Sequence, residues 1–330
     1  MGCLLEVENL SVEFALPGGG VVPAVNDVSY NVSEGEIIAV VGESGSGKSV
    51  SALAILGLVP QPPGRIVGGV IRFQGQNLLD LDEDGIRRVR GRKIAMIFQE
   101  PMTSLNPVLS IGRQLSESME LHLGLTPKQA HTRAVELLGM VGISDPQRRL
   151  TQYPHHLSGG MRQRVMIAMA LSCEPPLIIA DEPTTALDVT IQAQILSLMQ
   201  DLSRRLGVAL ILITHNLGIV ARYAHRVNVM YGGRVVEQGP ADEIYRRPSH
   251  PYTAGLLNSV PRLDRPRGVP LDPIPGNPVD LTRPIAGCAF RPRCRFAVAR
   301  CATEVPPLAS VGNHHASACW QVAALHAEVS

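Results

Sequence analysis

One stretch of the sequence has the residue types and spacing to hold a phosphate group. Residues 42–49 read GESGSGKS and satisfy the pattern G-x-x-x-x-G-K-[ST]. Glycines in such a loop let backbone N–H groups curl around phosphate oxygens, and the helix that follows adds the positive end of its dipole. Lys48 would place a positive charge on the β- and γ-phosphates, and the Ser49 hydroxyl would ligate Mg²⁺. The alternative is a Gly/Ser turn with an incidental lysine, which chance produces in roughly one chain in a hundred.

A phosphate loop needs a second metal anchor, and the sequence offers carboxylates for it. The apolar run at 177–180 is followed by Asp181 and Glu182. Asp181 would hold the Mg²⁺ shell, and Glu182 would polarise the attacking water. His215, which follows the run ALILIT, could hydrogen-bond a γ-phosphate, and Gln99 follows the run KIAMIF. Taken singly, each has an ordinary structural explanation: two acids can end a strand, a histidine can be structural, and a glutamine is usually solvated.

A cysteine cluster lies near the end of the chain. Four of the six cysteines, Cys288, Cys294, Cys301 and Cys319, fall within the last 43 residues. In a cytosolic protein such clustering favours a metal site over disulfides. The spacing lacks the close C-x₂-C pairs of common zinc modules, so zinc and an iron–sulfur cluster both remain open. A structural role is expected, because a proline-rich tail with little apolar periodicity needs a cross-link to fold.

Short apolar runs and helical periodicities alternate along the chain and would position these residues. Strand patterns at 4–14 and 24–41 flank a turn at 17–20, and further buried strands are expected at 177–180 and 209–214. Helical periodicity covers 112–142, 161–173 and 190–206. This alternation predicts an α/β fold with a parallel sheet and its ligand at the carboxyl ends of the strands.

Length and composition limit the possible classes of protein. The 330 residues are 45% hydrophobic and 18% charged with a formal net charge of +1, which excludes a disordered chain and gives no whole-chain attraction for a polyanion. The first 30 residues lack a secretory signal, and no apolar run reaches the 18 residues of a spanning helix. Because 13 of the 26 prolines lie between Pro240 and Pro307, we expect a loop-rich appendage there.

The segment LSGGMRQR at 157–164 completes a family resemblance, because it lies between the Gln99 loop and the Asp181-Glu182 strand. The chain resembles ABC-type ATPases over its whole length. The resemblance implies a P-loop NTPase fold: a RecA-like core, an antiparallel β subdomain and a helical signature subdomain at about 105–170. It places the ATPase domain at 1–240 and a C-terminal extension at 241–330. In that family, two ATPase subunits sandwich two ATP molecules.

The resemblance also implies a set of site residues. Catalysis would fall to Glu182, His215 and Gln99. Mg²⁺ would be held by Ser49, Gln99 and Asp181. ATP would contact Phe14 as an adenine-stacking ring, the loop residues Gly42, Glu43, Ser44, Gly45, Ser46, Gly47, Lys48, Ser49 and Val50, and Gln99, Ser158, Gly159, Gly160, Asp181, Asp188 and His215.

Four further segments resemble one subgroup, the ATP-binding subunits of dipeptide and oligopeptide importers, a type that importers of nickel, δ-aminolevulinate and other substrates share. They are GLVPQPPGRIVGG at 57–69, FQEPMTSLNP at 98–107, DEPTTALDVTIQAQIL at 181–196 and HPYTAGLLNSVP at 250–261. The subgroup implies a paralogous ATPase partner, two transmembrane permease subunits, an extracytoplasmic binding protein and a peripheral position on the cytoplasmic face of the inner membrane. It also implies a [4Fe-4S] cluster on Cys288, Cys294, Cys301 and Cys319.

Two other classes are weighed against this importer. A soluble ABC ATPase acting on nucleic acid or ribosomes would need a basic stripe or a coiled-coil insertion. A P-loop kinase or GTPase would leave the LSGG segment unexplained.

Overall fold

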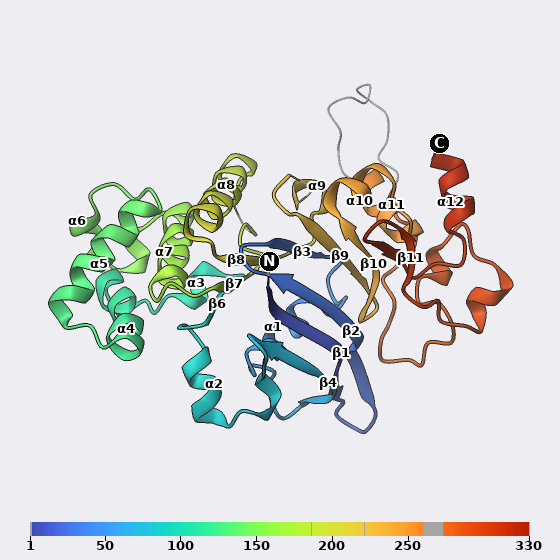
Figure 1. Ribbon diagram of the computed structural model, residues 1–330, viewed down its shortest axis with the longest axis horizontal. Helices are drawn as coiled ribbons and strands as arrows, with labels where there is room; N and C mark the ends of the chain where they lie inside the picture. Colours follow the sequence, from blue (N-terminus) through green and yellow to red (C-terminus); the bar gives the residue numbers. More distant parts are fainter. Residues whose placement is uncertain (1, 186, 221, 260–272, 330) are drawn as a thin grey trace. The chain divides into compact units, whose positions relative to one another are not determined.

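The computed structural model describes residues 2–185, 187–220, 222–259 and 273–329 (Figure 1). The chain forms two compact units. The first is built mainly from residues 80–213, and the second from residues 5–31, 38–79 and 214 onward. The second unit contains both the phosphate loop and the C-terminal segment. The domain boundary at residue 240 stays a prediction.

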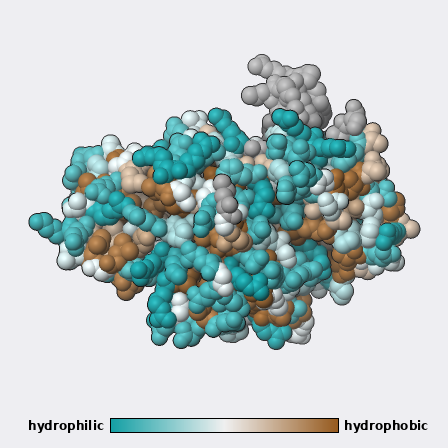
Figure 2. All heavy atoms as spheres, in the orientation of Figure 1, coloured by the Kyte–Doolittle hydropathy of each residue, from teal (hydrophilic) through white to brown (hydrophobic). Residues whose placement is uncertain are grey.

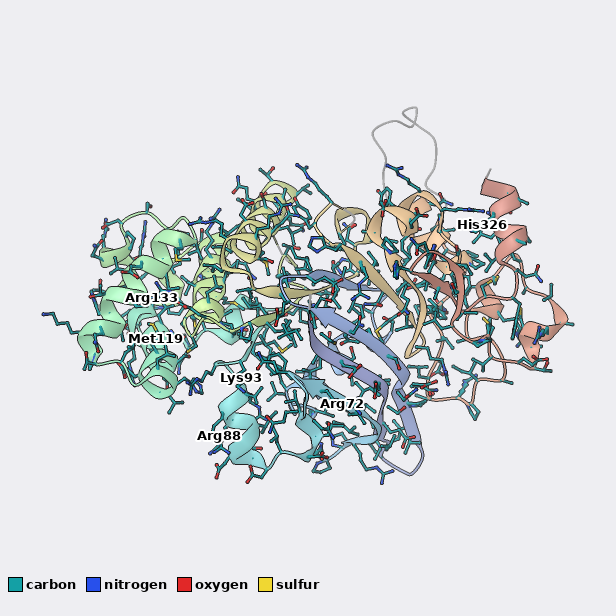
Figure 3. The ribbon with its side chains drawn as sticks, viewed as in Figure 1. Arg72, Arg88, Lys93, Met119, Arg133 and His326 are labelled. Atoms are coloured by element: carbon teal, nitrogen blue, oxygen red, sulfur yellow. The ribbon has the colours of Figure 1, made fainter. Side chains whose placement is uncertain are left out.

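The second unit contains a four-stranded sheet in the order β2-β1-β4-β5. Its strands are β1 Cys3–Ala15, β2 Val21–Ser33, β4 Gly64–Phe73 and β5 Gln76–Asn77. β1 runs antiparallel to β4. Leu5 and Val7, and then Leu10 and Val12, are buried on β1 with the period of two of a strand, and an irregularity between Glu8 and Ser11 shifts the phase between the two pairs. On β4, Arg72 reaches across to Glu6 and Glu8 on β1 (Figure 3).

A second set of strands in this unit leads to the phosphate loop. The order is β11-β12-β10-β9-β3, with β3 Ile37–Val41, β9 Arg226–Tyr231, β10 Arg234–Pro240, β11 Ala309–Gly312 and β12 His315–Ser317. β3 and β9 are parallel, with Val41 opposite Val229. Every residue of β3 is buried, which explains its continuous apolar run. This strand lies where the sequence predicts one.

Helices and aromatic side chains complete the second unit. The helices are α1 Lys48–Ile55, α9 Leu217–Val220, α10 Ala241–Arg246, α11 Pro251–Asn258 and α12 Val322–Val329, with 3₁₀ turns η1 Leu78–Asp80, η3 Arg291–Arg293 and η4 Ala299–Ala302. Tyr231, Tyr252 and Phe290 share one buried cluster with Val41 and Val229. Phe290 thus anchors the C-terminal segment in the core behind the phosphate-loop strand.

The first unit combines a parallel sheet with a group of helices. Its strands are β6 Ile94–Ile97, β7 Leu177–Asp181 and β8 Ala209–Thr214, and β7 pairs in parallel with both neighbours. The helices are α2 Glu83–Val89, α3 Pro101–Ser104, α4 Ile111–Leu123, α5 Pro127–Met140, α6 Pro146–Leu150, α7 Gly159–Leu171 and α8 Val189–Leu206, with the 3₁₀ turn η2 Pro154–His156. Met119 on α4 is fully buried among them, whereas Arg133 on α5 pairs with Glu136 (Figure 3).

Local signals in the sequence set the helix ends. Thr126 and Gln129 form a capping box at the start of α5. Gly124 ends α4 in the left-handed conformation. The predicted helical stretch 112–142 is therefore interrupted, because Gly124 and the Thr126-Pro127 pair stop one helix and begin the next.

The surface mixes apolar and hydrophilic residues. Figure 2 shows apolar patches scattered among hydrophilic side chains on the face drawn. The most exposed large apolar residues include Val108, Leu121 and Val189. Among the helices of the described residues, none has the length and hydropathy to cross a membrane.

Candidate functional site

The phosphate loop connects β3 to α1 in the second unit. Two of its glycines are required by close backbone contacts. A Cβ on Gly42 would stand 2.2 Å from the Met230 carbonyl oxygen, and one on Gly47 would stand 2.3 Å from that of Ala24. Gly47 also caps α1 with a φ of +98°. Side chains at these two positions are therefore excluded, and the loop backbone is left bare for an anion.

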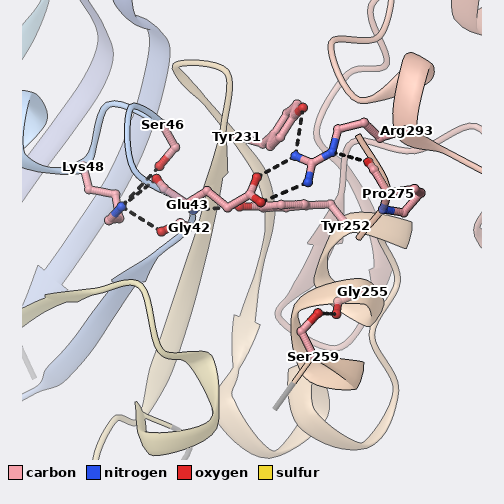
Figure 4. Close-up of polar contacts among 10 residues, drawn as sticks. All are labelled: Gly42, Glu43, Ser46, Lys48, Tyr231, Tyr252, Gly255, Ser259, Pro275 and Arg293. Atoms are coloured by element: carbon pink, nitrogen blue, oxygen red, sulfur yellow. Dashed lines mark hydrogen bonds and ion pairs between the residues drawn. The ribbon is translucent and has the colours of Figure 1, made fainter. Parts of the chain in front are cut away.

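Lys48 lies inside the loop and is 5% exposed. Its Nζ donates to the carbonyl oxygens of Gly42 at 2.7 Å and Glu43 at 2.9 Å, and lies 3.5 Å from Ser46 Oγ (Figure 4). The ammonium is thus held where the loop backbone curls, the place that a phosphate-binding lysine needs. Of the remaining loop residues, Ser44 and Gly45 are exposed, and Ser49 and Val50 are partly buried in the first turn of α1.

Glu43 extends away from this lysine. Its carboxylate receives Nη1 and Nη2 of Arg293 at 2.6 and 3.0 Å, and its backbone N–H donates to the Tyr252 hydroxyl at 2.8 Å. The hydrogen bonds to the Glu43 carboxylate raise the pKa of Arg293 above its ordinary value. Burial raises the pKa of the Tyr252 hydroxyl. The sequence patterns did not predict that Tyr252 and Arg293 contact Glu43. Tyr252 lies in the HPYT segment, and Arg293 lies next to Cys294.

The predicted carboxylates lie at the carboxyl end of β7 in the first unit. Asp181 is the last residue of β7 and is 6% exposed. Glu182 follows with a φ of +46°, and its N–H donates to the Ile213 carbonyl at 2.9 Å. A positive φ at a residue other than glycine is uncommon and often marks a functional position.

Two side chains hold the Glu182 carboxylate. Gln99 Nε2 donates to Glu182 Oε2 at 3.2 Å, and Thr185 Oγ1 donates to the same oxygen at 2.7 Å. The structure therefore brings together Gln99 and Glu182, which are 83 positions apart in the sequence. Thr185 was not among the predicted site residues, although its hydroxyl follows the two acids closely enough to have suggested a turn contact.

The signature segment starts helix α7 in the same unit. Ser158 is the N-cap, and its Oγ accepts from the Met161 N–H at 3.4 Å. Gly159 and Gly160 form the first turn, and a Cβ on Gly160 would stand 3.2 Å from Ile191 on α8. Asp188 caps α8 by accepting from the Ile191 N–H at 2.9 Å. A helix start with two glycines presents bare N–H groups, which suit an anion.

Phe14 and His215 both belong to the second unit. Phe14 is partly buried on β1, opposite Gly64 in β4. His215 follows β8 and is exposed. Their predicted contacts with adenine and with the γ-phosphate remain predictions.

The four C-terminal cysteines line one small cavity together with Phe290, Trp320 and neighbouring residues. The Cys288 N–H donates to the Cys301 carbonyl at 2.9 Å, which ties two of the four together. Burial raises the pKa of the Cys288 and Cys294 thiols, and that of Cys319 to about 12. Thiols in such surroundings stay protonated unless a metal displaces the proton.

Two family models match the chain. The model described as "ABC transporter" matches residues 25–185, and the model described as "Oligopeptide/dipeptide transporter, C-terminal region" matches residues 236–301. The second match includes most of β10, all of α10 and α11, and three of the four clustered cysteines.

Curated relatives match nearly the whole chain. The oligopeptide transport ATP-binding protein OppD of Bacillus subtilis is 50% identical over 317 residues, covering 96% of this chain and 88% of OppD. The dipeptide transport ATP-binding protein DppD of the same organism is 49% identical, covering 96% and 94%. A probable peptide ABC transporter ATP-binding protein of Sinorhizobium fredii, y4tR, is 51% identical, covering 96% and 95%.

Solved structures agree with these matches. The ATP-binding cassette MJ0796, in a dimeric post-hydrolysis state with ADP and Pi, aligns with a TM-score of 0.65 and 28% identity, covering 72% of this chain and 99% of that one. The protein cbiO1 of Clostridium perfringens, part of a cbiONQ ABC transporter complex, aligns with a TM-score of 0.63 and 29% identity, covering 74% and 91%.

A phosphate loop between β3 and α1 and acids at the end of a parallel strand define a P-loop NTPase. With a glycine-rich signature helix and relatives of about half-identical sequence, this chain belongs to the family of ABC transporter ATP-binding proteins and has their ATPase nucleotide-binding fold.

Proposed function

We propose that this chain is the ATP-hydrolysing, energy-coupling subunit of an ABC importer for dipeptides or oligopeptides. The substrate class is supported by the oligopeptide and dipeptide transport functions that OppD and DppD are named for, and by the oligopeptide/dipeptide match at 236–301. The observation that carries the enzymatic role is the Glu182 carboxylate, fixed by Gln99 and Thr185 directly after Asp181. A carboxylate held in this way can orient and polarise a water molecule.

Different residues of the site would bind the phosphates, Mg²⁺, the attacking water and the adenine ring. The loop at 42–49 would hold the phosphates with Lys48 as a point charge, and Val50 would follow in the same helix turn. Ser49, Gln99 and Asp181 would hold Mg²⁺, which neutralises charge on the phosphates when bound. Glu182 would act on the water, His215 on the γ-phosphate, and Phe14 on the adenine ring.

The site calls for a second ATPase subunit. Ser158, Gly159 and Gly160, with Asp188, would complete the site of the partner subunit. The dimeric state of MJ0796 supports a second ATPase subunit. We propose a paralogous partner, two permease subunits and a binding protein, with this chain at the cytoplasmic face of the inner membrane. ATP binding would close the pair of ATPases, and hydrolysis would open it and drive the permeases.

The C-terminal extension, residues 241–330, would hold a [4Fe-4S] cluster on Cys288, Cys294, Cys301 and Cys319. Four thiols and no other ligand suit zinc or an iron–sulfur cluster. A single zinc ion needs every sulfur about 2.3 Å from one point. Within the described ranges, no three His, Cys, Asp or Glu residues are placed to hold one ion. The four cysteines line one small cavity, and the resemblance to peptide-importer ATPases favours the iron–sulfur cluster over zinc. When bound, the cluster would cross-link four points of the segment.

Purification of the complex from membranes tests the transport role. We expect the preparation to contain two permease chains and a second ATPase, and ATP turnover to rise with a panel of peptides and their binding protein. Glu182→Gln should lower turnover by roughly 10²- to 10⁴-fold while ATP binding stays unchanged.

Glu174→Gln is the matched control, because Glu174 is an exposed carboxylate of the same unit that pairs with Arg133. Its turnover should equal that of the wild type. Normal ATP turnover in Glu182→Gln would contradict the proposed catalytic role of Glu182. Purification of the chain without any membrane protein would contradict its proposed role as a transporter subunit.

A further inference from the structure

Arg293 connects the phosphate loop to the cysteine segment, which we define as residues 288–319. Figure 4 shows the Glu43 side chain reaching from the loop toward the Arg293 guanidinium, while Lys48 points to the loop carbonyls. All of these residues belong to the second unit. The ion pair joins positions 250 residues apart.

The Arg293 guanidinium is buried and fully engaged. Its side chain is 5% exposed. Two of its nitrogens bind the two Glu43 carboxylate oxygens, Nε donates to the Pro275 carbonyl at 2.9 Å, and Nη1 lies 3.5 Å from the Tyr231 hydroxyl. Forked pairs of this kind fix geometry as well as charge, and loss of one partner leaves a buried charge uncompensated.

The backbone of Glu43 is held from the same side. Its N–H donates to the hydroxyl of Tyr252, a fully buried residue whose ring packs against Tyr231 and Phe290 at centroid distances of 4.6 and 5.4 Å. Because Lys48 Nζ binds the Glu43 carbonyl oxygen, the anchoring of Glu43 also bears on the position of the lysine.

Arg293 in turn depends on the cysteine segment for its position. It ends the short turn η3, in which its N–H donates to the Phe290 carbonyl at 3.0 Å. The next residue is Cys294, whose N–H donates to the Arg291 carbonyl at 3.1 Å. A change in the fold around the cysteines would therefore move the guanidinium that holds Glu43.

We propose that Arg293 is a positioning residue for nucleotide binding, which makes the affinity of the phosphate loop for MgATP depend on the folded cysteine segment. Arg293 holds Glu43, Glu43 holds Lys48, and the loop is kept in its phosphate-binding shape before ATP arrives. A loop ordered beforehand loses less entropy on binding. The inference rests on the proposed function only in that the loop binds ATP.

The test measures the affinity of the full-length chain for MgATP with a fluorescent ATP analogue. We expect Arg293→Met and Glu43→Gln each to weaken binding roughly five- to twentyfold, in the lower part of the roughly 5- to 150-fold range usual for coupling between distinct sites. The double variant should bind no more weakly than the worse single variant, because the pair acts as a unit. Arg293→Lys, which keeps the charge without the fork, should recover part of the loss.

Arg295→Met is the matched control. Arg295 lies on the other side of Cys294 in the same segment, is largely exposed and pairs with Glu328. Its affinity should stay within twofold of the wild type. Thermal unfolding of each variant, followed by circular dichroism, checks that Arg293→Met folds; if it does not, Glu43→Gln reports on the same pair from the loop side.

Cys294→Ser tests the dependence on the cysteine segment. We expect it to open the segment, as seen by limited proteolysis, and to weaken MgATP binding as much as Arg293→Met does. Wild-type affinity in both Arg293→Met and Glu43→Gln would overturn the positioning role. Wild-type affinity in Cys294→Ser would overturn the dependence on the segment. Absence of ATP binding by the wild type would instead contradict the proposed function.

Discussion

The phosphate loop and the cysteine segment belong to the same unit but are built in opposite ways. The loop is eight consecutive residues, and Lys48 Nζ donates to the Gly42 carbonyl oxygen only six positions away. The segment spans residues 288–319, and its short turns are held by contacts such as that between Cys288 and Cys301 and by packing of Phe290 in the core. A local motif can be identified from spacing alone, whereas a site assembled by packing cannot. The Glu43–Arg293 pair nevertheless makes the local motif depend on the assembled one.

The largest predicted effect is a loss of MgATP affinity when a glycine of the phosphate loop is replaced. Gly47→Ala would place a Cβ 2.3 Å from the Ala24 carbonyl oxygen at a φ of +98°. We expect MgATP affinity to fall by roughly 100-fold or more, about 2.7 kcal/mol, because the backbone must move. In Gly45→Ala the added Cβ would have no neighbouring atom within 4 Å, although φ is +78°. We expect this variant to lose only about 1 kcal/mol of MgATP binding free energy.

Equal losses of MgATP affinity in Gly47→Ala and Gly45→Ala would contradict this account of the phosphate loop. They would mean that strain in the loop, rather than the close backbone approach at Gly47, sets its binding competence. Fluorescence titration with the ATP analogue provides both affinities.

The second prediction concerns the cysteine segment. Cys301→Ser places a hydroxyl at a site that is 7% exposed. We expect a loss of about 1–3 kcal/mol in the free energy of unfolding from the buried hydroxyl, together with loss of iron and of the visible absorption band from the purified protein. Iron and sulfide analysis, an absorption spectrum and a denaturant titration measure these quantities.

Cys3→Ser is the control for this prediction, because Cys3 is an exposed thiol outside the segment. It should keep both the stability and the metal content of the wild type. Full stability of Cys301→Ser, or zinc in place of iron, would show that the segment is held by packing or by another metal.

The third prediction is a dependence of stability on pH at the start of α11. Burial lowers the pKa of His250 to about 3, from an ordinary value near 6.5, and its Nδ1 accepts the Tyr252 N–H at 3.1 Å. The unfolded chain therefore takes up a proton before the folded chain does. Stability is complete above pH 6.5 and falls as the pH drops toward 3, by about 2 kcal/mol at pH 5.

His250→Asn should flatten this pH dependence, because asparagine can cap the helix without titrating. The measurement is the unfolding midpoint between pH 7.5 and 5, with the exposed His131→Asn as control. An unchanged slope in His250→Asn would assign the acid sensitivity to other groups.

Sequence patterns predicted the strand framework well, for a physical reason. The apolar runs at 37–41, 177–180 and 209–214 correspond to β3, β7 and β8, because a strand covered on both faces needs continuous apolar residues. The helical stretch at 112–142 was harder to delimit. Its ends depend on Gly124 and the Thr126 cap, which interrupt an otherwise continuous period.

By itself, the sequence determined the phosphate loop, the acids after β7, the signature at 157–164 and the clustered cysteines, because these motifs are defined by spacing within a few residues. Only the tertiary structure decided which distant side chains hold them. Thr185 and Gln99 converge on Glu182, and Tyr252 and Arg293 converge on Glu43, through the packing of β7 and of the Tyr231–Phe290 cluster. These partners pair with buried charges and backbone groups because the fold brings them close in space. The spacing of residues along the sequence does not reveal such contacts.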